Sequence, residues 1–224
     1  MTRLYIGMVF GSLVILAIVG ILAYFWYKNR TLKRLTKKLG QSAETIINGD
    51  IATWAKHTRN KFIKANLYAY NSNMVFEVDG ILITNKGIIV VEIKSIKGEI
   101  HGDAASPQWI KQMGQKQHPT GNPIIQNDKH INHIMNMMQI KVPIVSLIVY
   151  SNRAESIKIT NTPAHVVLIR HSELFNSLDK INSVLDTKLS DQQVKKLYNK
   201  IKSFRTHNPK DVNLHKTITG QKGR

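Results

Sequence analysis

The stretch VFEVDGILITNKGIIVVEIKS, residues 75–95, constrains the fold of this chain more than any other segment. Two apolar runs flank a short Asn-Lys-Gly connection, which is the pattern of a β-hairpin. Each run carries acid that a core strand would lack: Glu77 and Asp79 on the first, and Glu92, followed by Lys94, on the second. Because an unpaired charge is costly inside a sheet, we expect these side chains to surround a divalent metal ion.

Strand alternation decides which of these side chains can meet. Glu92 and Lys94 are two residues apart and therefore share one face of the second strand. Asp79 joins them only in one register. A two-residue loop that pairs Thr84 with Gly87 sets Asp79 opposite Glu92, whereas a three-residue loop turns Asp79 away unless a bulge corrects it. A metal site therefore requires the first register or a bulge.

The residue types in this hairpin suit one kind of chemistry. Two carboxylates on one face repel each other unless a cation lies between them, and Mg²⁺ (or Mn²⁺) prefers such oxygen ligands. A neighbouring lysine can orient the attacking water or stabilise charge on a phosphate. The pattern predicts metal-assisted phosphodiester hydrolysis. The alternative is an ordinary exposed hairpin in which Glu92 and Lys94 are solvated charges.

The run EVDGILITNKGIIVVEIKSIKGEIHG resembles the core of the nuclease-related domain (NERD), a family placed among the PD-(D/E)XK phosphodiesterases. That family shows an Asp-bearing strand, a Gly-containing turn, a strand ending in E-x-K, and a G-x-I segment. The corresponding residues here are Asp79, Gly87, Glu92 with Lys94, and Gly98-Glu99-Ile100. An N-P-x-x-Q element, also typical of the family, matches residues 122–126, and the resemblance covers roughly residues 45–175.

The resemblance implies an α/β domain with a restriction-endonuclease-like fold, in which helices flank a mixed sheet. It implies that Asp79 and Glu92 bind the metal and that Lys94 is the catalytic lysine. The expected activity is hydrolysis of nucleic acid with Mg²⁺ or Mn²⁺. DNA is the favoured substrate and RNA the alternative. A nucleic-acid-binding module without catalysis is the alternative, and a scaffold for anionic lipid is a third hypothesis.

Further residues are drawn into the expected site by the resemblance. Gln126 would lie on the following helix near the metal or the phosphate, and the backbone carbonyl of Ile93 would complete the metal coordination. Asp50 follows Gly49 where the family commonly has Gly-Glu, which makes Asp50 a candidate further ligand. His130 and His133 are more typical of polar residues on a helix near a cleft than of metal ligands.

The N-terminal segment is apolar enough to span a bilayer. Residues 4–27 carry no charge, and a spanning helix needs about 20 apolar residues. A cleaved signal peptide is the alternative, but its apolar region covers only about 7–15 residues. We expect a transmembrane helix at 4–27 and a basic juxtamembrane linker at 28–40. Only Arg3 precedes the span, whereas six Lys and Arg follow it by residue 38, which predicts a single-pass cell-membrane protein with a cytoplasmic C-terminal domain.

The remaining patterns outline one domain at 41–205 and a tail. Periodicity predicts helices at 41–64, 124–139, 172–185 and 190–204, with a break at Asn48-Gly49-Asp50 as an option in the first. Strands are expected at 144–150 and 165–171, a further strand at 98–102 that continues the hairpin, and a long surface loop at 103–123. The tail at 206–224 is polar and basic, and we expect it to be disordered.

Composition adds two limits. The absence of cysteine excludes a disulfide framework and a thiolate metal site. The formal net charge of +18 favours polyanionic partners, nucleic acid and the anionic membrane surface among them.

Overall fold

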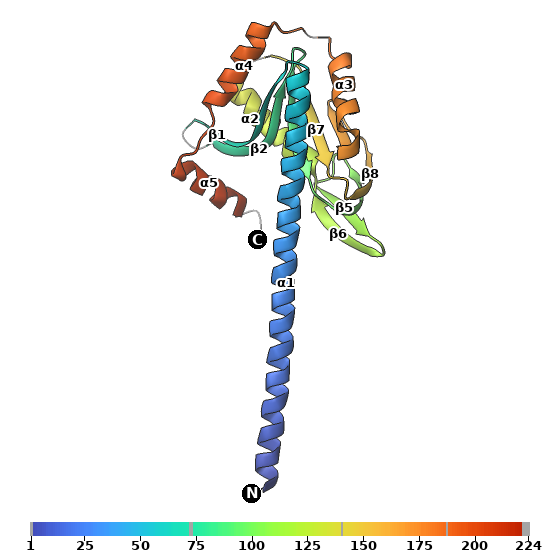
Figure 1. The fold of residues 1–224 in the computed structure, drawn as a ribbon, viewed down its shortest axis with the longest axis vertical. Coiled ribbons are helices and arrows are strands. Elements are labelled where there is room, and N and C mark those ends of the chain that lie inside the picture. The colour runs from blue at the N-terminus through green and yellow to red at the C-terminus, as the bar shows by residue number, and fades with distance from the viewer. Residues whose placement is uncertain (1, 72–73, 140, 187, 221–224) are drawn as a thin grey trace. The chain divides into compact units, whose positions relative to one another are not determined.

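The computed structural model describes residues 2–71, 74–139, 141–186 and 188–220 (Figure 1). The helices are α1 (Thr2–His57), α2 (Pro123–Met138), η1 (His171–Glu173), α3 (Leu174–Val184), α4 (Asp191–Ser203) and α5 (Pro209–Gly220). The strands are β1 (Lys61–Tyr70), β2 (Met74–Ile83), β3 (Ile88–Lys94), β4 (Gly98–Asp103), β5 (Gln108–Met113), β6 (Lys116–Gly121), β7 (Ile144–Tyr150), β8 (Ala154–Thr160) and β9 (Val166–Arg170). The chain divides into two compact units, Met1–Ser42 and Ala43–Arg224.

The first unit is the N-terminal part of α1. Two cation–π contacts lie along it. The Lys28 ammonium is 5.9 Å from the Tyr24 ring centre, and the Arg30 guanidinium is 5.1 Å from the Trp26 ring centre. The segment expected as a linker, residues 28–40, is part of helix α1. Within the described part of the chain, no helix combines the length and the apolar character that crossing a membrane requires.

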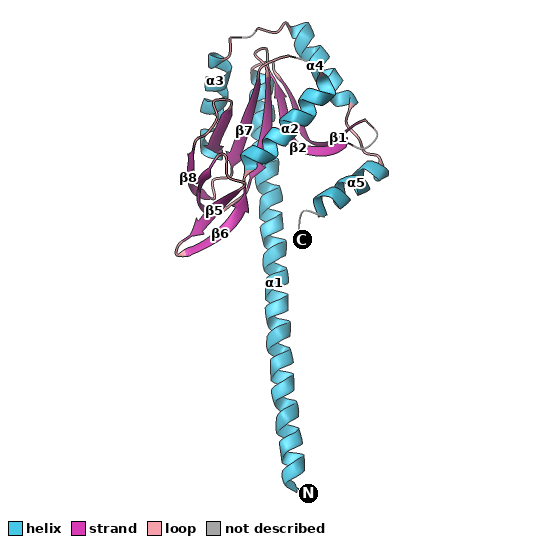
Figure 2. Ribbon diagram, turned by 180° about the vertical axis from the view of Figure 1, so that it is seen from behind, coloured by secondary structure: helices cyan, strands magenta, loops and turns pink. Residues whose placement is uncertain are grey.

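The second unit is built on a mixed five-stranded sheet in the order β1-β2-β3-β7-β9. Strands β1, β2 and β3 are antiparallel neighbours, whereas β7 and β9 run parallel to β3. Parallel strands need covered faces, and helices supply the cover in both views of the ribbon (Figures 1 and 2). The expected mixed α/β architecture is confirmed.

The two faces of β3 pack into different cores, as its alternation predicts. Ile89, Val91 and Ile93 pack with the C-terminal part of α1 and with α3. Ile88 and Val90 pack with α2 and α4 on the other face. Glu92 and Lys94 belong by alternation to this second face, so they point toward α2.

A second mixed sheet, in the order β6-β5-β4-β8, corrects two expectations. The strand at 98–102 does not continue the hairpin, and residues 103–123 are not a loop, because they form the β5–β6 hairpin. Strands β5 and β6 are mostly polar and exposed, so apolar periodicity did not reveal them. Gly102 is required here, since a Cβ on it would overlap the buried Trp109 ring.

Helix and strand boundaries differ from expectation around residue 60. Helix α1 runs without a break through Asn48-Gly49-Asp50 and ends at His57, and residues 61–64 belong to β1. Strand β1 was missed because polar and apolar residues do not alternate cleanly along it. At the other end of the domain, Ser190 caps α4 through its Oγ, which accepts from Gln193 N at 3.2 Å. The helix expected at 172–185 begins as the short helix η1, which contains Ser172, and continues as α3.

The tail at 206–224 was predicted to be disordered. Residues 209–220 of it form helix α5. Asn208 favours the helix start, because its Oδ1 accepts from Lys210 N at 3.0 Å. Thr206 holds the preceding turn, since its N–H donates to Leu67 O at 3.0 Å. Residues 221–224 lie outside the described residues.

Candidate active site

The hairpin has the register that brings the acids together. Gly80 pairs with Val91 and Ile83 with Ile88, and Thr84 N donates to Gly87 O at 2.9 Å across the two-residue turn. Continuing this register sets Asp79 opposite Glu92, as the first of the two alternatives required. No bulge is needed to bring the two acids to one face.

Glu92, Lys94 and Gln126 form a connected polar group at the C-terminal end of β3. The Lys94 ammonium lies 2.5 Å from Glu92 Oε1 and donates to Gln126 Oε1 at 2.8 Å. Glu92 is 2 % exposed, so its charge depends on these neighbours. The structure thus brings three of the predicted site residues into contact.

The Asn-Pro element positions Gln126 on α2. Asn122 is the N-cap, and its Oδ1 accepts from Ile124 N at 2.8 Å while its Nδ2 donates to the carbonyls of Ala104 and Ser106 at 2.9 and 2.7 Å. Pro123 occupies the first turn, where a missing N–H costs nothing. Gln126 then lies on the helix face above β3. The element is a fixed link between α2 and the β4–β5 loop.

Asp79 occupies a half-buried position next to the Glu92 carboxylate. Burial raises the pKa of Asp79 to about 7, the Glu92 charge adds to the shift, and the hydrogen bond from Ile93 N opposes it. That bond measures 2.8 Å to Asp79 Oδ2. Because the C=O of a strand residue points to the same side as its N–H, the Ile93 carbonyl also faces the Asp79 side of β3.

Glu92 has the opposite shift from Asp79. Burial alone would raise the pKa of Glu92, but His130 and Lys94 outweigh it and hold that pKa below its ordinary range. His130 Nε2 lies 3.5 Å from Glu92 Oε2, which is too long for a good hydrogen bond. Glu92 Oε2 is otherwise a buried atom without a hydrogen-bond partner among the described residues. The two carboxylates together therefore favour an added cation or a shared proton.

The candidate further acid, Asp50, has a partner outside the Glu92–Lys94–Gln126 group. Asp50 lies elsewhere, with its Oδ2 2.7 Å from His171 Nε2. Glu44, on the same helix, is the acid that reaches the site: burial raises its pKa, and the charges of Glu77 and Glu92 raise it further. Glu44 lies six positions before Asp50 on the helix, or about 9 Å along the axis. Glu44 precedes the buried Ile47 by three residues and so lies on the apolar face of the helix. An acid on an apolar face was the sequence signal that could have identified Glu44.

The donor set fits a hard divalent cation with few protein ligands. Among the described residues, no group of three or more His, Asp or Glu side chains is arranged to hold a metal. Mg²⁺ needs less, because it binds through one or two carboxylates and keeps several waters. Asp79, with its raised pKa, and the unpartnered Glu92 Oε2 supply two such carboxylates. The residues present therefore fit Mg²⁺ or Mn²⁺.

A cleft of about 570 Å³ opens over Asp79. Its walls come from β2, the start of α2 and α5, with Gln126 and His130 on the α2 side. Lys129 adds a cation to this lining. The cleft gives a substrate access to the acids from the α2 face of the sheet.

Comparison with known proteins agrees with this geometry. Residues 39–151 match the model of NERD, the nuclease-related domain. The chain belongs to the nuclease-related domain family. It is also similar to an uncharacterized protein of Bacillus anthracis, with 29% identity over 171 residues that cover 75% of this chain and 78% of the relative. No solved structure matches significantly.

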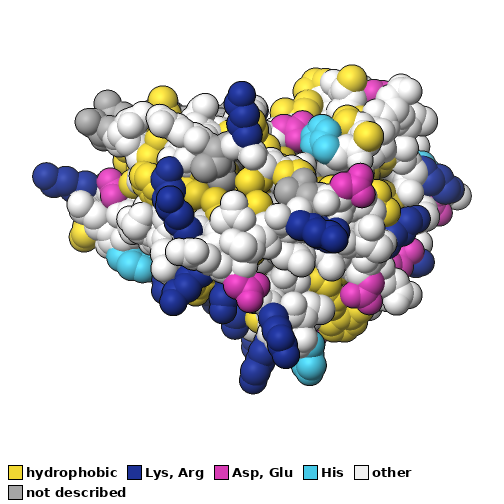
Figure 3. Space-filling model, turned by 90° about the horizontal axis from the view of Figure 1, so that it is seen from above, with side chains coloured by type: hydrophobic (Ala, Val, Ile, Leu, Met, Phe, Trp, Pro, Cys, Tyr) yellow, Lys and Arg dark blue, Asp and Glu magenta, His cyan; other side chains and the backbone are white. Residues whose placement is uncertain are grey.

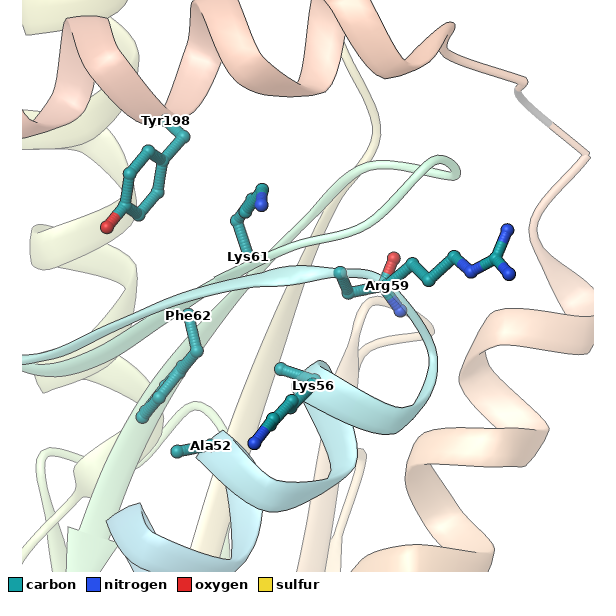
Figure 4. A pocket seen from close by; sticks show the side chains of 8 residues that line it. Ala52, Lys56, Arg59, Lys61, Phe62 and Tyr198 are labelled. Atoms are coloured by element: carbon teal, nitrogen blue, oxygen red, sulfur yellow. The ribbon is translucent and has the colours of Figure 1, made fainter.

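A second hollow of this NERD protein is basic. It measures about 390 Å³ and is lined by Lys56, Arg59 and Lys61, together with Phe62 and Tyr198. In Figure 4, Tyr198 and Phe62 lie on one side of the pocket with Lys61 beside them, whereas Arg59 points away. Figure 3 shows Lys and Arg side chains spread over the face seen from above, several of them near its lower edge, with acids between them. Such a surface attracts polyanions without fixing their position.

Proposed function

We propose that this NERD protein is a metal-dependent nuclease that hydrolyses phosphodiester bonds, with DNA as its main substrate. The observation that carries the proposal is the Glu92–Lys94–Gln126 group, with Glu92 buried, opposite Asp79. Membership of the nuclease-related family supports it independently. A restriction-endonuclease-like topology, with the E-x-K at the end of a central strand, is part of the same proposal.

Asp79 and Glu92 would hold Mg²⁺ or Mn²⁺, and the Ile93 carbonyl is placed on the side where it can add a ligand. When bound, the metal supplies Lewis-acid stabilisation of the phosphate charge and a more acidic water. Glu92 and Gln126 hold the Lys94 ammonium beside the proposed metal position. From there Lys94 can orient the attacking water or stabilise the phosphate oxygen. Gln126 acts as the residue that fixes the position of Lys94.

Asp79 also couples metal binding to pH. It must lose its proton to bind a cation, and its raised pKa means that the metal-free site retains a proton near neutral pH. Metal affinity should therefore increase with pH, since the proton and the cation compete for the same carboxylate.

The membrane location is proposed from sequence. The uncharged run at residues 4–27 and the basic residues that follow support a single-pass anchor with the nuclease domain in the cytoplasm. Membrane fractionation of the full chain and of a chain that begins at residue 39 tests it. Recovery of both in the soluble fraction would contradict the anchor.

One experiment tests the activity. The full chain in mild detergent is incubated with labelled DNA and RNA in Mg²⁺, in Mn²⁺ and in chelator, beside Glu92→Gln and Lys94→Ala. We expect metal-dependent cleavage that both substitutions abolish. Cleavage that survives both would refute the assigned site, and binding without cleavage in either metal would favour a nucleic-acid-binding module.

A further inference from the structure

Helix α5 forms one wall of the cleft that holds the candidate site. Its residues His215, Ile218 and Thr219 line the same cavity as Asp79 and Gln126. In Figures 1 and 2, α5 lies beside β1 and β2, apart from α3. A substrate that reaches Asp79 through this cleft therefore passes α5.

The contacts that hold α5 are few and exposed. None of its described residues is buried, in contrast to α2 and α4, which bury apolar side chains in the core. His215 Nδ1 lies 3.9 Å from Glu77 Oε2, and the Glu77 side chain is 54% exposed. Thr206 Oγ1 donates to Asp211 Oδ2 at 2.5 Å, within the tail itself. Elements with so little buried apolar surface open first, so α5 can leave the cleft while the domain stays folded.

Charge gives α5 a reason to dock and a reason to leave. Helix α5 carries two lysines, Lys210 and Lys216, and a single acid, Asp211. The cleft that α5 borders has two acids, Glu77 and Asp79, and one lysine, Lys129, in its lining, and Glu44 and Glu92 add negative charge close by. A cationic segment is attracted to such a cleft, and a nucleic acid offers phosphates that compete for the same cations.

We propose that α5 is a detachable lid that selects which nucleic acids reach the site, an inference that rests on the nuclease function proposed above. With α5 in place, the cleft has the volume of a small-molecule site, which is about 300–1,000 Å³. A single strand or a frayed end fits a space of that size. A duplex, whose major groove alone is about 12 Å wide, reaches Asp79 only after α5 has moved. The docked helix therefore favours single-stranded substrate over duplex.

Access to the cleft can be measured without any cleavage. The chain has no cysteine, so Ile125→Cys places a single thiol in the cleft lining on α2. The rate of its reaction with a bulky maleimide is compared in the full chain, in a chain that ends at Thr206, and in Ile218→Asp. Thr217→Asp is the matched control, because Thr217 is exposed on the same helix and is not part of the cleft lining.

We expect the thiol to react about 10-fold faster in the truncated chain and in Ile218→Asp, as for a site whose open state is a minority in the parent. The Thr217→Asp control should react at the parental rate. Equal rates in all four proteins would overturn the lid. Should the truncated chain fail to fold, Ile218→Asp against Thr217→Asp decides the question alone.

Cleavage then tests selection. Loss of α5 should raise cleavage of blunt duplex relative to single strand by about 10-fold, the same factor as the gain in access. An equal loss of cleavage on both substrates would make α5 a substrate contact and would overturn selection. Absence of cleavage by every chain would refute the nuclease function, while the thiol rates still decide whether α5 covers the cleft.

Discussion

The acidic cleft and the basic pocket are hollows of similar size, about 570 and 390 Å³, in the same domain. Their polar groups differ in how they are held. Asp79 and Gln126 line the cleft, and next to them Glu92 is buried and Lys94 is fixed between Glu92 and Gln126. In the pocket, Lys56, Arg59 and Lys61 are exposed.

The difference teaches that volume says little about chemistry. A buried charge is tolerated only when its neighbours satisfy it, and that requirement fixes its geometry. An exposed lysine keeps its hydration and its rotamers, so it contributes attraction without a defined position. We therefore expect substitutions in the cleft to change catalysis and substitutions in the pocket to change only binding strength.

The largest expected effect is on cleavage. Lys94→Ala removes the ammonium that Glu92 and Gln126 position, and it should lower the cleavage rate by about 10²–10³-fold, as for loss of one charge-stabilising donor. Lys61→Ala, the same change in the basic pocket, should leave the rate within about 2-fold of the parent. Single-turnover assays at saturating substrate measure both. Similar losses from the two substitutions would erase the proposed distinction.

The next effect is on stability and its dependence on pH. Burial raises the pKa of Asp79 to about 7, well above its ordinary value, so the folded state binds this proton more tightly than the unfolded state does. In chelator, the contribution of Asp79 to the free energy of unfolding should therefore be greatest below about pH 4 and be lost as the pH rises through 7. Asp79→Asn should remove this loss and stabilise the metal-free protein at pH 8 by roughly 2–4 kcal/mol.

Denaturant unfolding at pH 5 and pH 8 measures this effect. Glu77→Gln is the matched control, because Glu77 is an exposed acid on the same strand and should change stability little. Mg²⁺ should stabilise the parent at pH 8 and not Asp79→Asn, since a bound ligand stabilises only the state that binds it. A destabilised Asp79→Asn in chelator would show that the carboxylate is satisfied without a cation.

A smaller effect separates the two acids of α1. Glu44→Gln should lower cleavage about 10-fold, because Glu44 contributes charge near Glu92 without contacting Lys94. Asp50→Asn should leave cleavage within about 2-fold, since Asp50 pairs with His171 away from the cleft. Rates measured across a Mg²⁺ titration test both. A larger loss from Asp50→Asn than from Glu44→Gln would support Asp50 as the further acid of the site.

The smallest effect belongs to the basic pocket. Replacing Lys56, Arg59 and Lys61 by alanine should weaken DNA binding a few-fold. The slope of log binding constant against log salt concentration should become shallower by up to about 0.9 for each phosphate that the pocket no longer neutralises. Cleavage at saturating DNA should not change. Fluorescence anisotropy across a salt series measures the slope, and an unchanged slope would show that the pocket does not bind nucleic acid.

The hairpin was predictable because its information is local. Alternation fixed the faces of β3, and the length of the turn at residues 85–86 fixed the register that sets Asp79 opposite Glu92. The N-cap at Asn122 and the helix after it were equally local, and they place Gln126 against Lys94. Strands β5 and β6 were missed because their residues are polar and exposed, so their pairing depends on the partner strand more than on their own pattern.

Sequence by itself determined which residue types could do chemistry here, since the acids and the lysine interrupt apolar strands and the turn sets their register. Only the tertiary structure decided that Glu44 lies near them and that Asp50 pairs with His171, because the helix position along the sheet is set by packing of Ile47 and Ile51. It also decided that α5 borders the cleft, since contacts between residues so far apart leave no local pattern to read.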